Sequence, residues 1–408
     1  MTTDQGANMK KAMALYNEQI TTITWIPCAS HKIQICINNS LKRHSSVSFI
    51  FQRCKDIVVI FAGSSAATEI LGLHQKILFD GKEWKLLGFN KTRWNSWFIM
   101  AARVHKLMPA ILASIRELEE GSKDLKDKAK ALRDVVLCDD EIDALGEMLT
   151  LLQPAANFTH WAGSATRPTL SHVYARVYSL LPPVESLTTP QAQALHASLS
   201  SQIKESWPLT DIPDAILLAI YFNPACASSD FLMHTMVNGE SLLARAKALA
   251  AELIVESMRR RYEEEKKNQP LLVHDATMDT VQEVTRKGTA FLAINLYTAF
   301  SESKEKMKVF MDCLQDFWLQ QRTAALMELT PIALSYLCIQ ATSSSSERAF
   351  SQAGLILDQR RACTADHNFQ AVILSQSFAR VIPQIVKIQA EEEAARLQAR
   401  RNMFANFN

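Results

Sequence analysis

Residues 341–354 read Ala-Thr-Ser-Ser-Ser-Ser-Glu-Arg-Ala-Phe-Ser-Gln-Ala-Gly, and this stretch is the most informative part of the sequence about the fold. The serine run offers N-cap side chains, and Glu347 places a negative charge where it favours a helix N-terminus. An apolar helical pattern broken at Pro331 precedes the stretch, and another helical pattern follows it. The stretch therefore predicts a junction between helices in a mainly α chain.

The bulk composition agrees with a helical protein that has no strong charge of either sign. Glycine (11) and proline (13) are scarce in 408 residues, and these are the two poorest helix formers. Hydrophobic residues make up 48% and charged residues 21%, as in ordinary globular proteins. Because the net charge is only +2, any nucleic-acid binding would have to rest on local basic patches.

The sequence predicts neither a membrane span nor a disulfide framework. No stretch reaches about 18 uninterrupted apolar residues, and residues 1–11 lack the apolar centre of a secretory signal. The eight cysteines have no framework spacing, which favours reduced thiols in the cytosol or nucleus. We therefore expect no membrane partner.

Hydrophobic periodicity predicts helices along most of the chain. They span residues 8–16, 31–43, 46–77, 98–118 (with a kink or break at Pro109), 139–152 and 236–265. A β-branched and aromatic run predicts a single clear strand at Thr21–Ile26, ended by Pro27. Prolines predict a loop at 182–192, the polar residues 266–280 a mobile linker, and residues 389–401 a charged helix.

Four islands, in this order, resemble hAT transposases. They are residues 3–9 (Thr-Asp-Gln-Gly-Ala-Asn-Met), 28–31 (Cys-Ala-Ser-His), 92–96 (Thr-Arg-Trp-Asn-Ser), and 341–354 with Arg360 and Arg361. The last island is the most specific and resembles the family's C-terminal signature. Together the islands extend from Asp4 to about Pro383.

The resemblance implies a fold and a division of the chain. The family's fold is RNase H-like α/β, interrupted by a large all-helical insertion. We therefore expect a mainly α protein in which the two chain ends form a remnant of that fold. The expected parts are a truncated RNase H-like part at 1–97, the insertion at 98–330, the last RNase H-like helix with the hAT dimerisation region at 331–385, and a charged helical tail at 386–408.

The resemblance also implies metal-dependent DNA strand cleavage and transfer on three acids. Asp4 would be the second acid and Glu347 the third, and carboxylates suit the hard cations Mg²⁺ or Mn²⁺. The first acid would lie upstream of Met1, so we expect no transposase activity and no cofactor for this chain alone. Without the resemblance, Asp4 and the serines before Glu347 would be interpreted as helix caps.

Candidate DNA-contacting residues lie in the third island. In the family its tryptophan, here Trp94, is thought to stack on an unpaired base, while Arg93 and Lys91 could touch phosphate. The alternatives are a Trp94 wedged between helices and two ordinary surface cations. Arg259-Arg260-Arg261 precedes Glu263-Glu264-Glu265, which favours a self-compensating helix surface over a DNA patch.

The C-terminal apolar residues predict self-association, because the resemblance places the family's subunit-pairing segment there. The candidate dimerisation residues are Phe350, Leu355, Ile356, Leu357, Val372, Leu374 and Phe378. A monomer core would show the same periodicity, so the choice rests on the resemblance. We expect a homodimer or higher homo-oligomer and no small-molecule substrate.

Two smaller motifs carry less specific signals. Cys28 and His31 supply two potential ligands where a structural zinc needs four, so a packed or hydrogen-bonded pair is favoured. At Asn223-Pro224-Ala225-Cys226, uncharged residues replace the family's acidic and basic neighbours of this proline, which suggests that a local contact has relaxed.

The leading hypothesis is a nuclear, transposase-derived dimerisation module without catalysis, with weak DNA binding. One alternative is a fragment of an active hAT transposase. The other is a helical scaffold without a DNA role.

Overall fold

The computed structural model describes the chain with several gaps. The described residues are 2–4, 6–19, 24–89, 94–164, 169–227, 229–268, 276–301, 318, 324–344, 346–348 and 351. They fall into two compact units, residues 1–342 and 343–408. The prediction of a mainly α protein is confirmed, because most of the described residues are helical and the described strands form two small sheets.

The first sheet is a parallel pair that ties the N-terminal residues to the end of the first unit. β1 (Thr2–Thr3) pairs with β2 (Ile26–Pro27). The Thr2 hydroxyl donates to the Gln340 carbonyl at 2.7 Å, and the Ala29 N–H donates to the Ala341 carbonyl at 2.8 Å. Two segments far apart in sequence are therefore held together beside this sheet.

The predicted strand Thr21–Ile26 is wrong in its extent. Thr24 and Trp25 lie outside any strand, residues 21–23 are outside the described part, and β2 instead includes Pro27. Proline is tolerated here because the hydrogen bond to Thr3 comes from the following residue. The Cys28 N–H donates to the Thr3 carbonyl at 2.7 Å, so the missing N–H of Pro27 is not needed for this bond.

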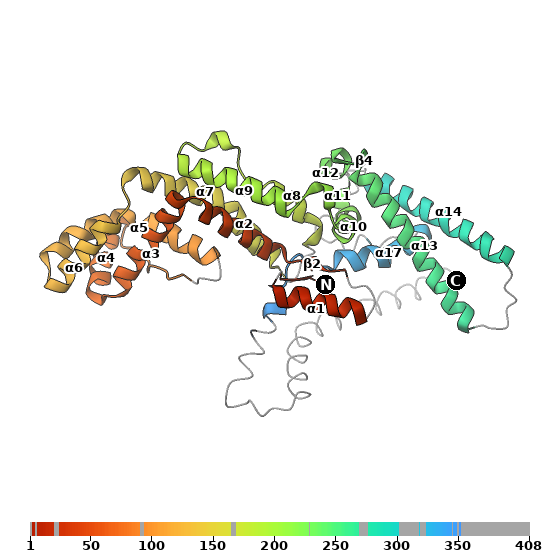
Figure 1. The fold of residues 1–408 in the computed structure, drawn as a ribbon, viewed down its shortest axis with the longest axis horizontal. Coiled ribbons are helices and arrows are strands. Elements are labelled where there is room, and N and C mark those ends of the chain that lie inside the picture. Colours follow the sequence, from red (N-terminus) through yellow and green to blue (C-terminus); the bar gives the residue numbers. More distant parts are fainter. Residues whose placement is uncertain are drawn as a thin grey trace, which may run out of the picture. The chain divides into compact units, whose positions relative to one another are not determined.

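The N-terminal half of the first unit is an array of helices (Figure 1). They are α1 (Ala7–Gln19), α2 (Ala29–Arg43), α3 (Ser45–Ala62), α4 (Ser65–Leu78), α5 (Trp94–Glu120), α6 (Lys123–Val135) and α7 (Asp139–Ala162). α5 packs on α3, α4, α6 and α7. It continues through Pro109, so the helix does not break where the sequence predicted a kink or break. By length and composition alone α5 could cross a membrane, but its buried side chains belong to the core of this array.

The second half is built around α10 (Asp214–Phe222), whose residues from Ala215 onward are all buried. Before it come η1 (Leu170–His172), α8 (Val173–Tyr178), η2 (Val184–Ser186), α9 (Pro190–Ser206) and η3 (Leu209–Asp211), and after it α11 (Pro224–Ala227) and α12 (Asp230–His234). α10 packs against η1, α11 and two of the long helices that follow in the chain, and it accepts a hydrogen bond from a third. The predicted loop at 182–192 contains a short 3-10 turn, η2. It ends at Pro190, which occupies the first position of α9.

These long helices are α13 (Leu242–Asn268), α14 (Ala276–Ser301) and α17 (Ala324–Leu337). The prediction that a helix begins at Met236 is wrong, because an antiparallel hairpin of β3 (Met236–Val237) and β4 (Glu240–Ser241) precedes α13. Asn238 and Gly239, both with positive φ, form its turn, as this dipeptide does in two-residue hairpins. The predicted linker 266–280 is helical at both ends, and residues 269–275 lie outside the described part.

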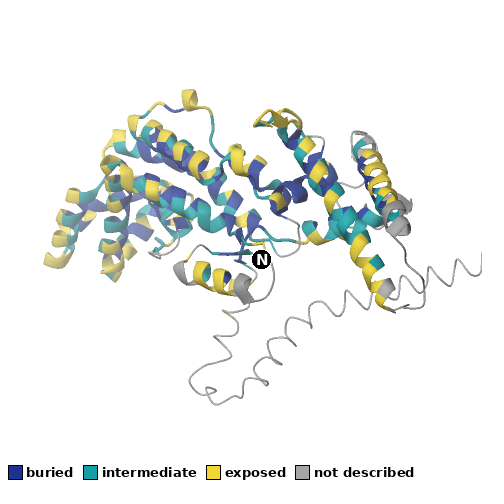
Figure 2. Cartoon of the chain, turned by 45° about the vertical axis from the view of Figure 1, so that its right-hand side comes forward, coloured by how far each residue is buried: buried dark blue, intermediate teal, exposed yellow. Residues whose placement is uncertain are grey.

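One contiguous hydrophobic cluster runs from Ile26 to Ala341 through both halves of the first unit. Figure 2, coloured by burial, shows buried residues alternating with exposed ones along the helices. The boundaries expected at 97/98 and 330/331 stay predictions, as does the RNase H-like ancestry of the N-terminal part.

The start of α9 is held by a carboxylate from α7. Glu147 accepts hydrogen bonds from the amides and hydroxyls of Thr188 and Thr189, including the Thr189 N–H at 2.8 Å. Partial desolvation alone would raise the pKa of Glu147, but these hydrogen bonds outweigh it and lower the pKa to about 2. A negative charge at a helix N-terminus is also favourable.

We expect Glu147→Ala to lower the free energy of unfolding by about 1–2 kcal/mol, since it removes a helix cap. Glu185→Ala, which removes an exposed carboxylate nearby, is the matched control and should have little effect. Because the pKa is lowered in the folded state, the contribution of Glu147 should be full above its unfolded pKa and disappear as pH falls towards 2. Urea unfolding across that range measures both effects. An equal loss in the two variants would contradict the capping role.

Candidate self-association surface

The C-terminal helices of the first unit are anchored by aromatic side chains that satisfy the last carbonyls of α10. The Tyr297 hydroxyl donates to the Tyr221 carbonyl at 2.7 Å, and the Trp318 indole N–H donates to the Phe222 carbonyl at 3.0 Å. The Tyr297 and Trp318 rings lie 4.9 Å apart. Since the final carbonyls of a helix have no partner within it, these donors tie α14 and residue 318 to the end of α10.

α17 completes this packing. Leu329, Ala333 and Leu337 are buried, and the helix contacts α10, α13 and α14. Thr330 also donates to the Trp318 carbonyl at 3.3 Å. The inward side of α17 therefore belongs to the core of the first unit.

α14 is apolar on its outward side as well as on its inward side. Ala290, Ala293, Ile294 and Tyr297 are buried, as expected for the inward side. On the other side Val284, Phe291, Leu292 and Leu296 are 68%, 71%, 52% and 39% exposed. Large apolar side chains exposed on the outward side of a helix whose inward side is already packed mark a candidate interaction surface.

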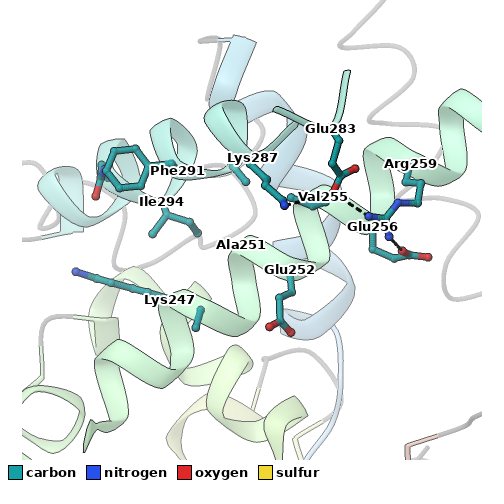
Figure 3. A pocket seen from close by; sticks show the side chains of 13 residues that line it. Lys247, Ala251, Glu252, Val255, Glu256, Arg259, Glu283, Lys287, Phe291 and Ile294 are labelled. Carbon is teal, nitrogen blue, oxygen red and sulfur yellow. Dashed lines mark hydrogen bonds and ion pairs between the residues drawn. The ribbon is translucent and has the colours of Figure 1, made fainter. Parts of the chain in front are cut away.

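A groove of about 810 Å³ runs between α13 and α14 beside Phe291 (Figure 3). Its apolar lining comes from Ala251 and Val255 on α13 and from Ala290 and Ile294 on α14. Charged side chains stand around it, namely Lys247, Glu252, Glu256, Arg259, Glu283 and Lys287. An apolar floor with a charged rim suits another amphipathic helix better than a nucleic-acid backbone.

The three consecutive arginines of α13 are neutralised by carboxylates. Arg259 pairs with Glu256 and Glu283 at 3.1 and 3.0 Å, Arg260 pairs with Glu256 at 2.9 Å, and Arg261 pairs with Glu328 of α17. The prediction of charge compensation is confirmed, and the partners are Glu256 on the same helix and carboxylates of two neighbouring helices. These pairs hold α13 against α14 and α17.

A second group of polar side chains is buried at the C-terminal end of α10. Asn223 is fully buried, and its Nδ2 donates to the Ser171 hydroxyl at 2.8 Å and to His172 Nε2 at 3.0 Å. Its Oδ1 accepts from the Ala225 N–H at 3.1 Å, and the Cys226 sulfur lies 3.3 Å from His172 Nδ1. Uncharged residues therefore form a packed network here, and the hypothesis that a contact of the family has relaxed at 223–226 stays a prediction.

This network fixes the protonation of His172. Since Asn223 Nδ2 donates to Nε2, the proton of a neutral imidazole lies on Nδ1, facing Cys226. A second proton on Nε2 would face another donor. Burial, followed by the positive charge of Arg176, lowers the pKa of His172 below its usual 6.5.

We expect the stability of the protein to fall as pH drops below about 6.5. Just below that pH, His172 binds a proton in the unfolded state but not in the folded state. The contribution of His172 to the free energy of unfolding is therefore full above the unfolded pKa and shrinks below it. One such group changes the free energy of unfolding by at most about 1.4 kcal/mol per pH unit. Urea unfolding between neutral pH and pH ~5.5 measures the slope. His172→Gln should flatten it, and identical slopes in the two proteins would contradict the assignment.

The two predicted acids lie in different compact units. Asp4 is partly exposed, and its carboxylate accepts the Gly6 N–H at 3.0 Å in a local turn. Glu347 is exposed in the second unit: the Ser343 hydroxyl donates to its carboxylate at 2.7 Å, and its amide donates to the Ser343 carbonyl at 3.0 Å. A helix therefore starts after Ser343, and capping of its amides by the serine hydroxyls stays a prediction.

The described residues do not fit the Mg²⁺ or Mn²⁺ that the resemblance implies. Within the described ranges, no group of three or more His, Cys, Asp and Glu side chains could hold a metal ion. We derive no metal-dependent step from this geometry.

Trp94 begins α5 and is only 3% exposed, with its ring 6.0 Å from that of Phe98. Its indole nitrogen is buried and has no hydrogen-bond partner among the described residues. This placement agrees with the packing alternative, and base stacking would require the ring to leave the core. The predicted phosphate contacts Arg93 and Lys91 lie outside the described residues.

The motif at 28–31 lies where β2 leads into α2. Cys28 is buried and His31 is partly buried, and their pairing stays a prediction. The next residue, Lys32, donates to the Ser206 carbonyl and lies 4.4 Å from the centre of the Trp207 ring. Burial lowers the pKa of Lys32 to about 8, despite the opposing effect of Cys36. Sequence patterns did not single out this lysine, because its neighbours come from distant α9.

The residues predicted to carry dimerisation, Phe350, Leu355, Ile356, Leu357, Val372, Leu374 and Phe378, all lie outside the described part. The outward side of α14 was not predicted. Its apolar residues are visible in the sequence, but periodicity alone does not say which of the apolar residues of a helix face out.

Taken together, the geometry defines a mainly helical protein with an exposed apolar surface on its C-terminal helices and no assembled metal site among the described residues. Comparison with protein families adds that residues 295–378 match the hAT family C-terminal dimerisation region. A comparison with curated proteins gave no match. The match contains the signature at 341–354 and all seven predicted dimerisation residues, and it supports the resemblance to the hAT family.

Proposed function

We propose that this chain is a self-association module derived from a hAT transposase. The observation that carries the proposal is the match of residues 295–378 to the family's dimerisation region. The apolar surface of α14 adds support, because the matched segment begins on that helix at Asn295. Exposed apolar area of this kind is typical of surfaces that pair with a partner.

Co-expression of two copies with different tags tests the proposal. Purification through one tag should recover the other copy in comparable amount, and the complex should survive raised salt because apolar contacts are not screened. Recovery of only the captured copy at every expression level would contradict self-association and leave the helical scaffold as the better account.

We further propose that these 408 residues do not catalyse strand transfer by themselves. The chemistry that the resemblance implies needs three acids, and only Asp4 and Glu347 match those positions in this sequence. A nicking assay on terminal-repeat DNA with Mg²⁺ or Mn²⁺ should show no metal-dependent cleavage. Nicking that Glu347→Ala abolishes would instead favour the enzyme.

DNA binding and a nuclear location are the remaining parts of the proposal. With a net charge of +2 and the three arginines of α13 paired, binding should be weak and local. A mobility-shift assay should show weak affinity that falls steeply with salt, as for phosphate contacts. Imaging of a tagged chain tests the location.

A further inference from the structure

We propose that the α14 outer face, made of Val284, Gly288, Phe291, Leu292 and Leu296, docks against the same face of a second copy of this chain. The inference rests on the proposed self-association and names a surface that carries it. The family match does not cover this surface, except for Leu296, because it begins at residue 295.

The first argument is the exposure of this face. Its four large apolar side chains are all at least partly exposed, although the opposite side of the same helix is already packed on the core. Val284, Leu292 and Leu296 are spaced by multiples of four residues and Phe291 follows Val284 by seven, so the four share one side of the helix, together with the exposed Asn295. Covering such a patch is favourable, since burial of apolar area is the main driving force of association.

Gly288 is the second and independent argument. Glycine in the middle of a helix is unfavourable relative to alanine, so its presence needs a cause. No described atom lies within 4 Å of the position that a Cβ on Gly288 would take. No described part of the chain therefore excludes a side chain at position 288. A second helix that approached this face closely would exclude one.

The spacing of the face suits a two-fold arrangement. Val284, Gly288, Leu292 and Leu296 are four residues apart and form one ridge of the helix. In an antiparallel pair centred on Ala290, Val284 of one copy faces Leu296 of the other, and Gly288 faces Leu292. The large Leu292 then faces the small Gly288, and the apolar Val284 and Leu296 face each other. The same surface thus fits itself, as an isologous contact requires.

A second copy is the occupant that the sequence context favours. α14 is one helix from Ala276 to Ser301, and its last turns lie in the segment that matches a dimerisation region. A contact on α14 therefore continues directly into that segment. The α13–α14 groove beside Phe291 offers about 810 Å³ for side chains of the second copy (Figure 3).

Sedimentation equilibrium of the full chain and three variants tests the inference. Leu292→Glu places a charge in the face and should weaken dimerisation at least about tenfold. Gly288→Gln should weaken it too, while raising the unfolding temperature of the monomer because glutamine is the better helix former. Ile77→Glu makes the same kind of change at an exposed apolar residue of α4 and should leave the dissociation constant unchanged.

The outcomes separate this inference from the proposed function. If the unchanged chain is monomeric at all concentrations, the proposed function fails and this inference fails with it. If the unchanged chain dimerises and neither Leu292→Glu nor Gly288→Gln alters the dissociation constant, only the α14 contact is wrong. If Leu292→Glu lowers the unfolding temperature of the monomer and leaves dimerisation intact, the face packs within one chain, which also overturns the inference.

Discussion

Trp318→Ala should lower the free energy of unfolding by about 3–5 kcal/mol, the usual cost of truncating a buried tryptophan. The side chain is fully buried, and its indole N–H satisfies the Phe222 carbonyl. Its ring also lies 4.9 Å from Tyr297 and 6.2 Å from Phe222. The substitution leaves both a cavity and an unpaired carbonyl, and these effects act in the same direction.

Urea unfolding followed by far-UV circular dichroism measures the loss. Trp84→Ala is the matched control, because Trp84 is only partly buried, with Lys106 over its ring. We expect the control to lose clearly less stability. Equal losses in the two variants would mean that the aromatic anchor at the end of α10 is not a principal support of the C-terminal helices.

Asn223→Leu should cost about 2–4 kcal/mol, although leucine is close in volume and the site is buried. The reason is that the Ser171 hydroxyl, His172 Nε2 and the Ala225 amide all lose their partner at once. Buried polar atoms left unpaired cost more than the net gain of the original hydrogen bonds.

Asn157→Leu provides the control for this substitution. Asn157 is exposed on α7 and makes one hydrogen bond, with Gln153 at 2.9 Å. Its loss should change stability by no more than about 0.5 kcal/mol. A loss of that small size for Asn223→Leu would show that the network is not structurally important.

Much of the helical architecture could be predicted from periodicity. The helices expected at 31–43 and 139–152 correspond to α2 and α7, because a 3.6-residue apolar repeat on one side has few alternatives. The hairpin before α13 was missed even though Asn238-Gly239 is a strong turn signal. The apolar residues around the turn fitted a helix as well, and this overrode the local signal.

The buried network around Asn223, the position of Trp94 and the outer face of α14 were harder to predict from the sequence. Asn223 meets Ser171 and His172 only in the folded chain, about fifty positions away, and no spacing rule finds such a pair. Trp94 stands in a polar stretch that suggested exposure, yet the helix it begins turns it into the core. The resemblance to hAT transposases located the C-terminal segment, whereas the outer face of α14 became visible only once its other side was seen to be packed.

The measurement that tests the central claim most directly is sedimentation equilibrium of the 408-residue chain over a wide range of concentrations. The monomer mass is 45.8 kDa. Self-association predicts a mass that rises with concentration towards twice that value or a higher multiple. A mass that stays at 45.8 kDa across the range would contradict the account.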